Sequence, residues 1–231
     1  MTLKAKLKAL ETRLLQFPGA DMSDPATRRR AERSVFWMDH GFVRAWWHNF
    51  EQIAPGVYRS NQPTRVRLAR AKAMGINTIL SLRGDGIRAN QMLEKADCAD
   101  LGLRLITVSL RSSRAPARDA VLNLIDIFHN IERPFLMHCK SGADRAAVAS
   151  AVWLMVMEGA PVEDARKMLS LRYAHVKRFK TGVLDAFLDE YAARNARAPI
   201  GFEQWLRDEY DADALQARFN DARKKRKECT G

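Results

Sequence analysis

The amino-acid sequence predicts an α/β fold with a short central parallel sheet flanked by helices, and with extra helices at both ends of the chain. Three observations lead to this prediction. From about residue 55, short apolar runs typical of strands alternate with runs of helical periodicity. Glycines stand where several of these runs end. The 47% of hydrophobic residues is enough to form a core. Alternating strands and helices are typical of a parallel sheet covered on both faces.

Four runs are expected to form the strands. They are GVYRS, NTILSLRG, LRLITVSL and PFLMHC, at residues 56–60, 77–84, 103–110 and 134–139. Helices are expected at residues 64–75, 88–101, 116–131 and 146–158, and again at 162–173, 181–196 and 201–226. Pro116 is expected in the first turn of its helix, a position that proline favours.

The two ends of the chain are expected to be helical extensions. We place an N-terminal extension at residues 1–50, a central domain at 51–196 and a C-terminal extension at 197–231. In the first of these, Leu3, Leu7, Leu10 and Leu14 are spaced as on one face of a helix that packs on the core.

The segment 35–50 is dense in aromatic residues, including Trp37, Trp46 and Trp47. Such side chains can stack on bases or contact a membrane. Because large aromatic residues dominate protein cores, we expect them to be buried.

Composition narrows the classes of protein. No stretch is apolar and uncharged for long enough to span a bilayer, and charges interrupt the N-terminus where a signal peptide needs an apolar block. Three widely spaced cysteines without metal-ligand spacing favour reduced thiols, so we expect a cytoplasmic protein. The net charge of +12 indicates acidic partners. The basic residues are dispersed and form no nucleic-acid motif, so no specific nucleic acid is expected.

One loop carries the candidate chemistry. In PFLMHCKSGADRAAVASAVWLM, a strand ends at His138-Cys139, and a helix begins six residues after the cysteine, at Arg145. Backbone N–H groups at a helix N-terminus bind anions, and the same positive field favours a thiolate. Cys139 is therefore the candidate nucleophile and Arg145 the clamp for two phosphate oxygens. The loop residues Lys140, Ser141, Gly142 and Ala143 are expected to bind phosphate, and His138 to orient the loop. This chemistry requires no metal or other cofactor.

HCKSGADR resembles the signature loop of the protein tyrosine phosphatase superfamily. Together with the run Tyr58-Arg59-Ser60-Asn61-Gln62-Pro63 and with LSLRG, it is similar to bacterial proteins of the dual-specificity-like group over about residues 50–196. The resemblance implies a tyrosine phosphatase-like fold and hydrolysis of phosphomonoesters, with residues 51–196 as the catalytic domain.

The sequence departs from this family in two places. Family members usually carry Ser or Thr after the arginine, a hydroxyl that helps the thiolate leave, whereas this chain has Ala146. The loop SLRSSRAPARD, where the family places its general acid, has no carboxylate before Asp119. Asp144 is the first candidate for the acid, because it resembles the aspartate before the signature arginine of myotubularin lipid phosphatases; its alternative role is helix capping. Asp85 and Asp119 are the further candidates.

Several cations are expected around the pocket. Arg83, Arg111 and Arg114 follow strand ends, and Arg88 and Lys140 are close in sequence to such ends. They suit a phosphorylated protein or an anionic phospholipid, such as a phosphoinositide or lipid A, with peripheral membrane contact. A protein tyrosine or dual-specificity phosphatase is the leading hypothesis. The alternatives are a phospholipid phosphatase and a phosphate-binding module without turnover. Cys98 is expected in the core, or in a disulfide with Cys139.

Overall fold

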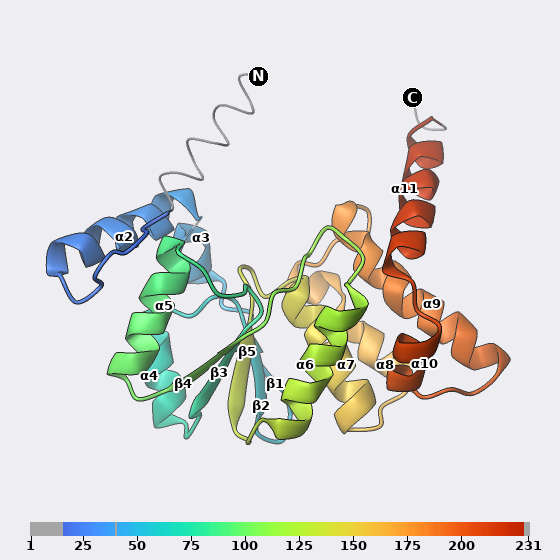
Figure 1. The fold of residues 1–231 in the computed structure, drawn as a ribbon, viewed down its shortest axis with the longest axis horizontal. Helices are drawn as coiled ribbons and strands as arrows, with labels where there is room; N and C mark the ends of the chain where they lie inside the picture. The colour runs from blue at the N-terminus through green and yellow to red at the C-terminus, as the bar shows by residue number, and fades with distance from the viewer. Residues whose placement is uncertain (1–15, 40, 229–231) are drawn as a thin grey trace.

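The computed structural model describes residues 16–39 and 41–228 and confirms the α/β fold (Figure 1). Within these residues, a five-stranded sheet has the order β1-β2-β5-β3-β4. The strands β2, β5, β3 and β4 are parallel, as predicted, whereas β1 pairs with β2 in the antiparallel direction at one edge. The strands are β1 (Glu51–Ala54), β2 (Val57–Ser60), β3 (Thr78–Ser81), β4 (Arg104–Thr107) and β5 (Phe135–His138).

Helices cover both faces of this sheet (Figure 1). The helices α4 and α5 lie on one face, with α2 packed on α5, and α6 and α7 lie on the other face together with α10. The described helices are α2 (Pro25–Met38), α3 (Gly41–Trp46), α4 (Arg65–Ala73), α5 (Ala89–Asp100), α6 (Arg118–Asn130), α7 (Arg145–Met157), α8 (Val162–Ala165), α9 (Val183–Arg197), α10 (Phe202–Asp208) and α11 (Ala212–Glu228).

The central strand β5 shows how the two faces are filled. Side chains alternate between the faces of a strand. Leu136 accordingly joins the cluster formed with α4 and α5, whereas Phe135 and Met137 join the larger cluster formed with α6 and α7. Both clusters consist of side chains removed from water, and their burial is the main force that holds the helices on the sheet.

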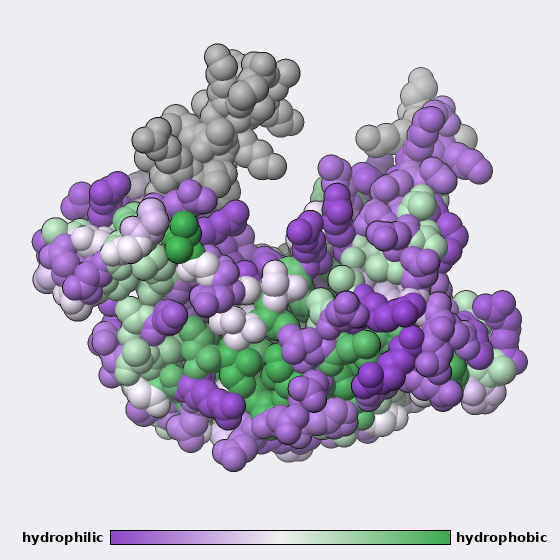
Figure 2. Space-filling view, in the orientation of Figure 1, coloured by the Kyte–Doolittle hydropathy of each residue, from purple (hydrophilic) through white to green (hydrophobic). Residues whose placement is uncertain are grey.

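The C-terminal residues complete the larger cluster. Trp205 and Tyr210 are buried against Phe187 of α9, with ring centroids 5.6 and 4.9 Å from the Phe187 ring. The Tyr210 hydroxyl also donates a hydrogen bond of 2.7 Å to the Pro116 carbonyl. Residues 202–215 therefore contribute to the same hydrophobic core as the sheet, whereas the end of α11 projects away from it (Figure 1 and Figure 2).

Three local predictions were wrong. Residues 201–226 do not form one helix, because α10 ends at Asp208 and α11 begins at Ala212. Pro116 is not in the first turn of α6, because that helix begins at Arg118 and the Pro116 carbonyl is bound to Tyr210 instead. Residues 162–173 do not form one helix. A single turn, α8, is followed by two 3₁₀ turns, Arg166–Met168 and Leu171–Tyr173, and a further 3₁₀ turn, Lys180–Gly182, precedes α9.

The predicted burial of the aromatic segment was also wrong. The side chains of Trp46, Trp37 and Trp47 are 93%, 68% and 47% exposed. Both faces of the sheet are already covered, and the six-residue helix α3 lies close to the loops at the sheet edge instead of over a face (Figure 1). No apolar layer is therefore left to receive these side chains.

The predicted helical face of Leu3, Leu7, Leu10 and Leu14 lies outside the described residues.

Across residues 16–39 and 41–228, the structure contains no helix of the length and apolar character needed to cross a membrane.

Candidate active site

The loop 139–144 joins the C-terminal end of β5 to the first turn of α7. The strands on either side of β5 end at the same level, because Ser60 of β2 and Ser81 of β3 are both in register with His138. The loop therefore emerges at the carboxyl edge of a parallel sheet, where such folds place their functional groups. Cys139 is buried at its start, and α7 begins directly at Arg145.

Gly142 allows the loop to turn tightly. Its φ is +75°, a conformation that side chains other than glycine rarely adopt. A Cβ at this position would lie 2.7 Å from the Asn49 Cβ and 2.9 Å from the Asn61 backbone nitrogen. The loop thus requires glycine for two reasons, its dihedral angle and the close approach of two other segments.

The loop is supported from behind by side chains far away in sequence. Arg59, which is fully buried, donates from Nη2 to the Gly142 carbonyl. Its guanidinium lies over the Tyr173 ring, 3.9 Å from the centroid, a cation–π contact. Asn49 donates hydrogen bonds of 3.0 Å to the carbonyls of Ser141 and Tyr173. These contacts hold the loop carbonyls from behind, and within the loop the Ala143 N–H donates to the Ser141 hydroxyl at 3.3 Å.

Arg145 faces a pocket of about 580 Å³ that opens beside this loop. Its Nη1 donates a long hydrogen bond of 3.4 Å to the Leu82 carbonyl, whereas its buried Nε has no hydrogen-bond partner among the described residues. An unpaired buried donor is costly, so this guanidinium is poised to bind an anion. The predicted residues that line the pocket with Arg145 are Arg83, Arg88, Arg111, Lys140 and Asp85.

Asp39 also lines this pocket, and sequence reasoning missed it. Its buried carboxylate accepts two hydrogen bonds from Arg83, of 2.9 and 3.1 Å, and lies 3.0 Å from the Lys140 ammonium. Asp39 follows α2, a hundred residues before the signature loop, and no motif marks it. It offsets part of the positive charge of the pocket and holds two of its cations in place.

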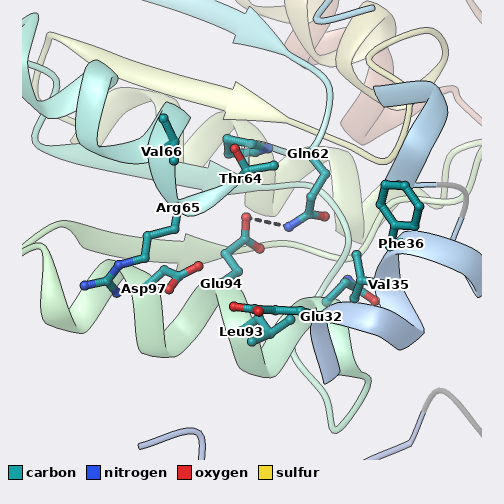
Figure 3. A pocket seen from close by; sticks show the side chains of 13 residues that line it. Glu32, Val35, Phe36, Gln62, Thr64, Arg65, Val66, Leu93, Glu94 and Asp97 are labelled. Atoms are coloured by element: carbon teal, nitrogen blue, oxygen red, sulfur yellow. Dashed lines mark hydrogen bonds and ion pairs between the residues drawn. The ribbon is translucent and has the colours of Figure 1, made fainter. Parts of the chain in front are cut away.

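His138 is held by a buried acid, Glu94, that the sequence did not indicate. His138 Nε2 lies 2.6 Å from Glu94 Oε1, and Ser81 donates to Oε2. Gln62 donates a hydrogen bond of 2.9 Å to the same Oε1 (Figure 3). Burial alone would raise the pKa of Glu94, but His138 and these hydrogen bonds hold it below its usual value. The ring of His138 is therefore fixed from α5, and its Nδ1 lies 3.3 Å from the Cys139 carbonyl.

Asp144 does not cap α7 through its side chain. Its carboxylate instead lies 2.8 Å from His175 Nδ1, and His175 Nε2 lies 2.7 Å from Asp185. Burial alone would lower the pKa of His175, but the two carboxylates raise it to about 9. His175 is thus a buried imidazolium that ties the residue before Arg145 to α9.

The three acid candidates occupy different places. Asp85 lines the pocket together with Arg145, and its carboxylate accepts a hydrogen bond from the Gly86 nitrogen. Asp144 is paired with His175 and does not line the pocket, and Asp119 is exposed at the start of α6, also outside it. Only Asp85 of the three therefore lies in the same cavity as the predicted phosphate clamp.

Other predicted residues lie elsewhere. Arg114 lines a separate pocket between the loop before α6 and α11. Cys98 and Cys139 are both free thiols, so the disulfide is not formed. Cys98 is buried in the smaller core cluster, where burial raises the pKa of its thiol to about 12. Over the described part of the chain, no three His, Cys, Asp or Glu side chains are grouped as a metal site.

Comparison with known proteins agrees with this geometry. A family model described as a DSP-PTPase phosphatase fused to NAD+ kinase matches residues 48–183, more than half of the chain. This chain belongs to that phosphatase family. The match includes β1, the signature loop and the segment as far as Val183. No curated protein matches the chain.

Solved structures of phosphatases share the fold at low sequence identity. P. aeruginosa TpbA is 18% identical, with a TM-score of 0.50 over 74% of this chain and 90% of that one. The core catalytic domain of the PP-IP phosphatase SIW14 from S. cerevisiae is 14% identical, with a TM-score of 0.50 over 68% and 98%. Tk-PTP in its active form is 18% identical, with a TM-score of 0.51 over 63% and 97%. These likenesses show the tyrosine phosphatase-like fold.

Within this phosphatase family, Ala146 remains a departure. It is fully buried at the first turn of α7, so no hydroxyl follows the signature arginine. The hydroxyl of Ser150, one turn later, donates to the Ala146 carbonyl at 2.6 Å. Ser150 is thus bonded to its own helix and does not replace the missing group.

Replacing Gly142 tests the tight turn. Gly142→Ala should abolish vanadate binding and destabilise the fold by more than the ~1 kcal/mol of an unfavourable φ, because the added Cβ also clashes with Asn49 and Asn61. Gly159→Ala is the matched control, since Gly159 has φ +67° and nothing within 4 Å of the added Cβ. Equal effects of the two variants in urea unfolding and vanadate titration would contradict this account.

His175 should make stability depend on pH. Because its pKa is raised above the usual 6.5 to about 9, its stabilisation is complete below about pH 6.5 and is lost as the pH rises toward 9. The loss is at most about 3 kcal/mol, since one pKa unit corresponds to 1.36 kcal/mol. In urea unfolding between pH 6 and 9.5, His175→Gln should be less stable than the wild type at pH 6 and should lack most of this fall. Parallel curves for the two proteins would show that His175 is not the group concerned.

Proposed function

We propose that this phosphatase hydrolyses phosphomonoesters through a cysteinyl-phosphate intermediate on Cys139. The observation that carries the proposal is the unpaired, buried Nε of Arg145 beside the loop that begins at Cys139. An anion bound in this loop would receive loop N–H groups and the planar guanidinium, as the transferred phosphoryl group requires.

The reaction follows in two steps. The Cys139 thiolate attacks phosphorus, an S–P bond forms and the bond to the ester oxygen breaks, while the leaving oxygen takes a proton from an acid. Water then attacks phosphorus and gives its proton to the same carboxylate. The S–P bond breaks, so inorganic phosphate is released and the Cys139 thiolate is restored. Arg145 binds the equatorial oxygens in both steps. We propose Asp85 as the acid ahead of Asp144, because Asp85 lines the pocket.

Asp144 is then a positioning residue. It precedes Arg145 directly and is bound to His175, so the hydrogen bonds from α9 fix where α7 starts. Arg83 and Arg111 widen the positive surface around the phosphate, with Lys140 on the loop itself. Phosphotyrosine proteins are the substrate class we propose first. An anionic phospholipid is the second candidate, because the pocket is lined by cations and aromatic side chains are exposed near it.

The proposed chemistry predicts metal-independent turnover of an activated aryl phosphate. With p-nitrophenyl phosphate and a chelator, the wild type should turn over and be inhibited by vanadate, and Cys139→Ser should lose at least about 10³-fold in kcat. Arg145→Lys should lose both rate and vanadate affinity, because an ammonium cannot bind two oxygens in a plane. Full activity of Cys139→Ser would overturn the mechanism. A burst of one equivalent without turnover would instead identify a module that is phosphorylated but not hydrolysed, as Ala146 would explain.

The leaving group distinguishes the acid. Asp85→Asn should lower kcat/KM, which reports the first step, by about 10²-fold or more for phenyl phosphate, a poor leaving group, and leave it nearly unchanged for dinitrophenyl phosphate. Asp144→Asn should lower kcat/KM for both substrates by a similar factor, as expected of a residue that positions the loop. The reverse pattern, in kcat/KM measured side by side, would return the role of acid to Asp144.

A further inference from the structure

The segment from the last turn of α2 to the start of β1 presents aromatic side chains to solvent beside the active site. We call the six residues Phe36, Trp37, Phe42, Trp46, Trp47 and Phe50 the aromatic rim, and each is more than 40% exposed. Two other tryptophans, Trp153 and Trp205, are buried in the core. The exposure of tryptophan side chains is therefore confined to this segment, and tryptophans elsewhere in the fold are buried. A concentration of exposed aromatic side chains marks a contact surface.

Two residues within the segment that carries the aromatic rim bind the signature loop. Asp39, between Trp37 and Phe42, pairs with Lys140 of the loop and with Arg83. Asn49, next to Phe50, donates to the Ser141 carbonyl. Whatever surface the rim contacts, these bonds hold the mouth of the catalytic pocket close to it.

Basic side chains extend the rim along α2. Arg29, Arg33 and Trp37 are exposed and are spaced four residues apart, so they form one stripe along the helix. The stripe is basic over its first turns and aromatic at its end. Tryptophan favours the boundary between lipid headgroups and acyl chains, and arginine binds anionic headgroups. The overall charge of +12 adds to the attraction by an anionic surface.

The shape of this region favours a bilayer over a peptide. Trp46 is 93% exposed, so it protrudes and is not the wall of a closed groove. With Trp47 and Phe50 it borders only an open hollow next to Arg172. Phe36 also lines an apolar pocket of about 400 Å³ between α2, α4 and α5, which extends the apolar surface (Figure 3). Protruding apolar side chains flanked by arginine insert into an interface, whereas peptide sites bury their anchors.

We propose that the aromatic rim docks this protein on anionic phospholipid bilayers, with Trp46 and Trp47 at the headgroup level and Arg29 and Arg33 against the headgroups. The catalytic pocket then faces the membrane surface, because Asp39 and Asn49 link the rim to the signature loop. This inference concerns where the enzyme works and is independent of the chemistry proposed for Cys139.

Vesicle binding tests the proposal with a protein that cannot turn over. Full-length Cys139→Ser should sediment with vesicles of phosphatidylcholine and phosphatidylglycerol, much less with phosphatidylcholine alone, and less as salt increases. Adding Trp46→Ser and Trp47→Ser should reduce the partition coefficient at least tenfold. Adding Met74→Ser should leave it unchanged. Met74 is half-exposed at the end of α4, on the edge of the sheet opposite the signature loop, so it controls for loss of exposed apolar surface.

Three results would overturn the proposal. The first is no preference for anionic vesicles, and the second is equal binding by the tryptophan and Met74 variants. The third is a loss of at least tenfold in kcat/KM for a phosphotyrosine peptide when the tryptophans are replaced in the protein that retains Cys139, together with no vesicle binding by the parent protein. The last would identify the rim as a peptide site. Thermal unfolding of each variant shows whether it is folded. Hydrolysis of p-nitrophenyl phosphate by the same variants with Cys139 retained shows whether the proposed chemistry is intact.

Discussion

The tight turn at Gly142 is the constraint on which the rest of the site depends. Only a residue without Cβ allows the backbones near Asn49 and Asn61 to approach it, and the Arg59 guanidinium binds its carbonyl from the buried side. With the carbonyl occupied, the turn can direct N–H groups toward an anion, as in other anion-binding loops. The strands then matter because they deliver the segments that meet here: β2 carries Arg59, and β5 ends at the loop.

Acidic side chains offset part of the positive charge of the pocket. Arg83 is paired with Asp39, and Lys140 lies beside the same carboxylate, while Glu94 lies 2.6 Å from His138 Nε2 beneath the loop. Buried charges need partners, and the acid that holds Arg83 and Lys140 comes from the segment after α2, far from both in sequence. Arg145 differs, because a buried donor of its guanidinium is unpaired among the described residues. The unpaired donor of the pocket is therefore the Arg145 guanidinium, at the position where phosphate would bind.

The parts of this structure that the sequence predicted are those governed by local patterns. The four parallel strands and the helices around them follow from apolar periodicity, and Cys139 and Arg145 stand out because their loop lies between a strand and a helix. Asp39 and Glu94 could not be found in this way, since their roles arise from partners 44 or more residues away. The exposure of Trp46 was mispredicted for the same reason. Composition favours burial, but only the packed sheet shows that no apolar face is left for that side chain.

The bonds between the aromatic rim segment and the signature loop join the proposed membrane-binding surface to the phosphate site. Asp39 and Asn49 both lie within the segment that carries the rim, and both bind residues of the signature loop. A displacement of this segment therefore acts directly on Lys140 and Ser141. If the rim enters a lipid interface, the lower dielectric there strengthens the ion pair between Asp39 and Lys140 and so steadies the loop. The elements that would hold the enzyme at a surface are thus the ones that shape its phosphate site.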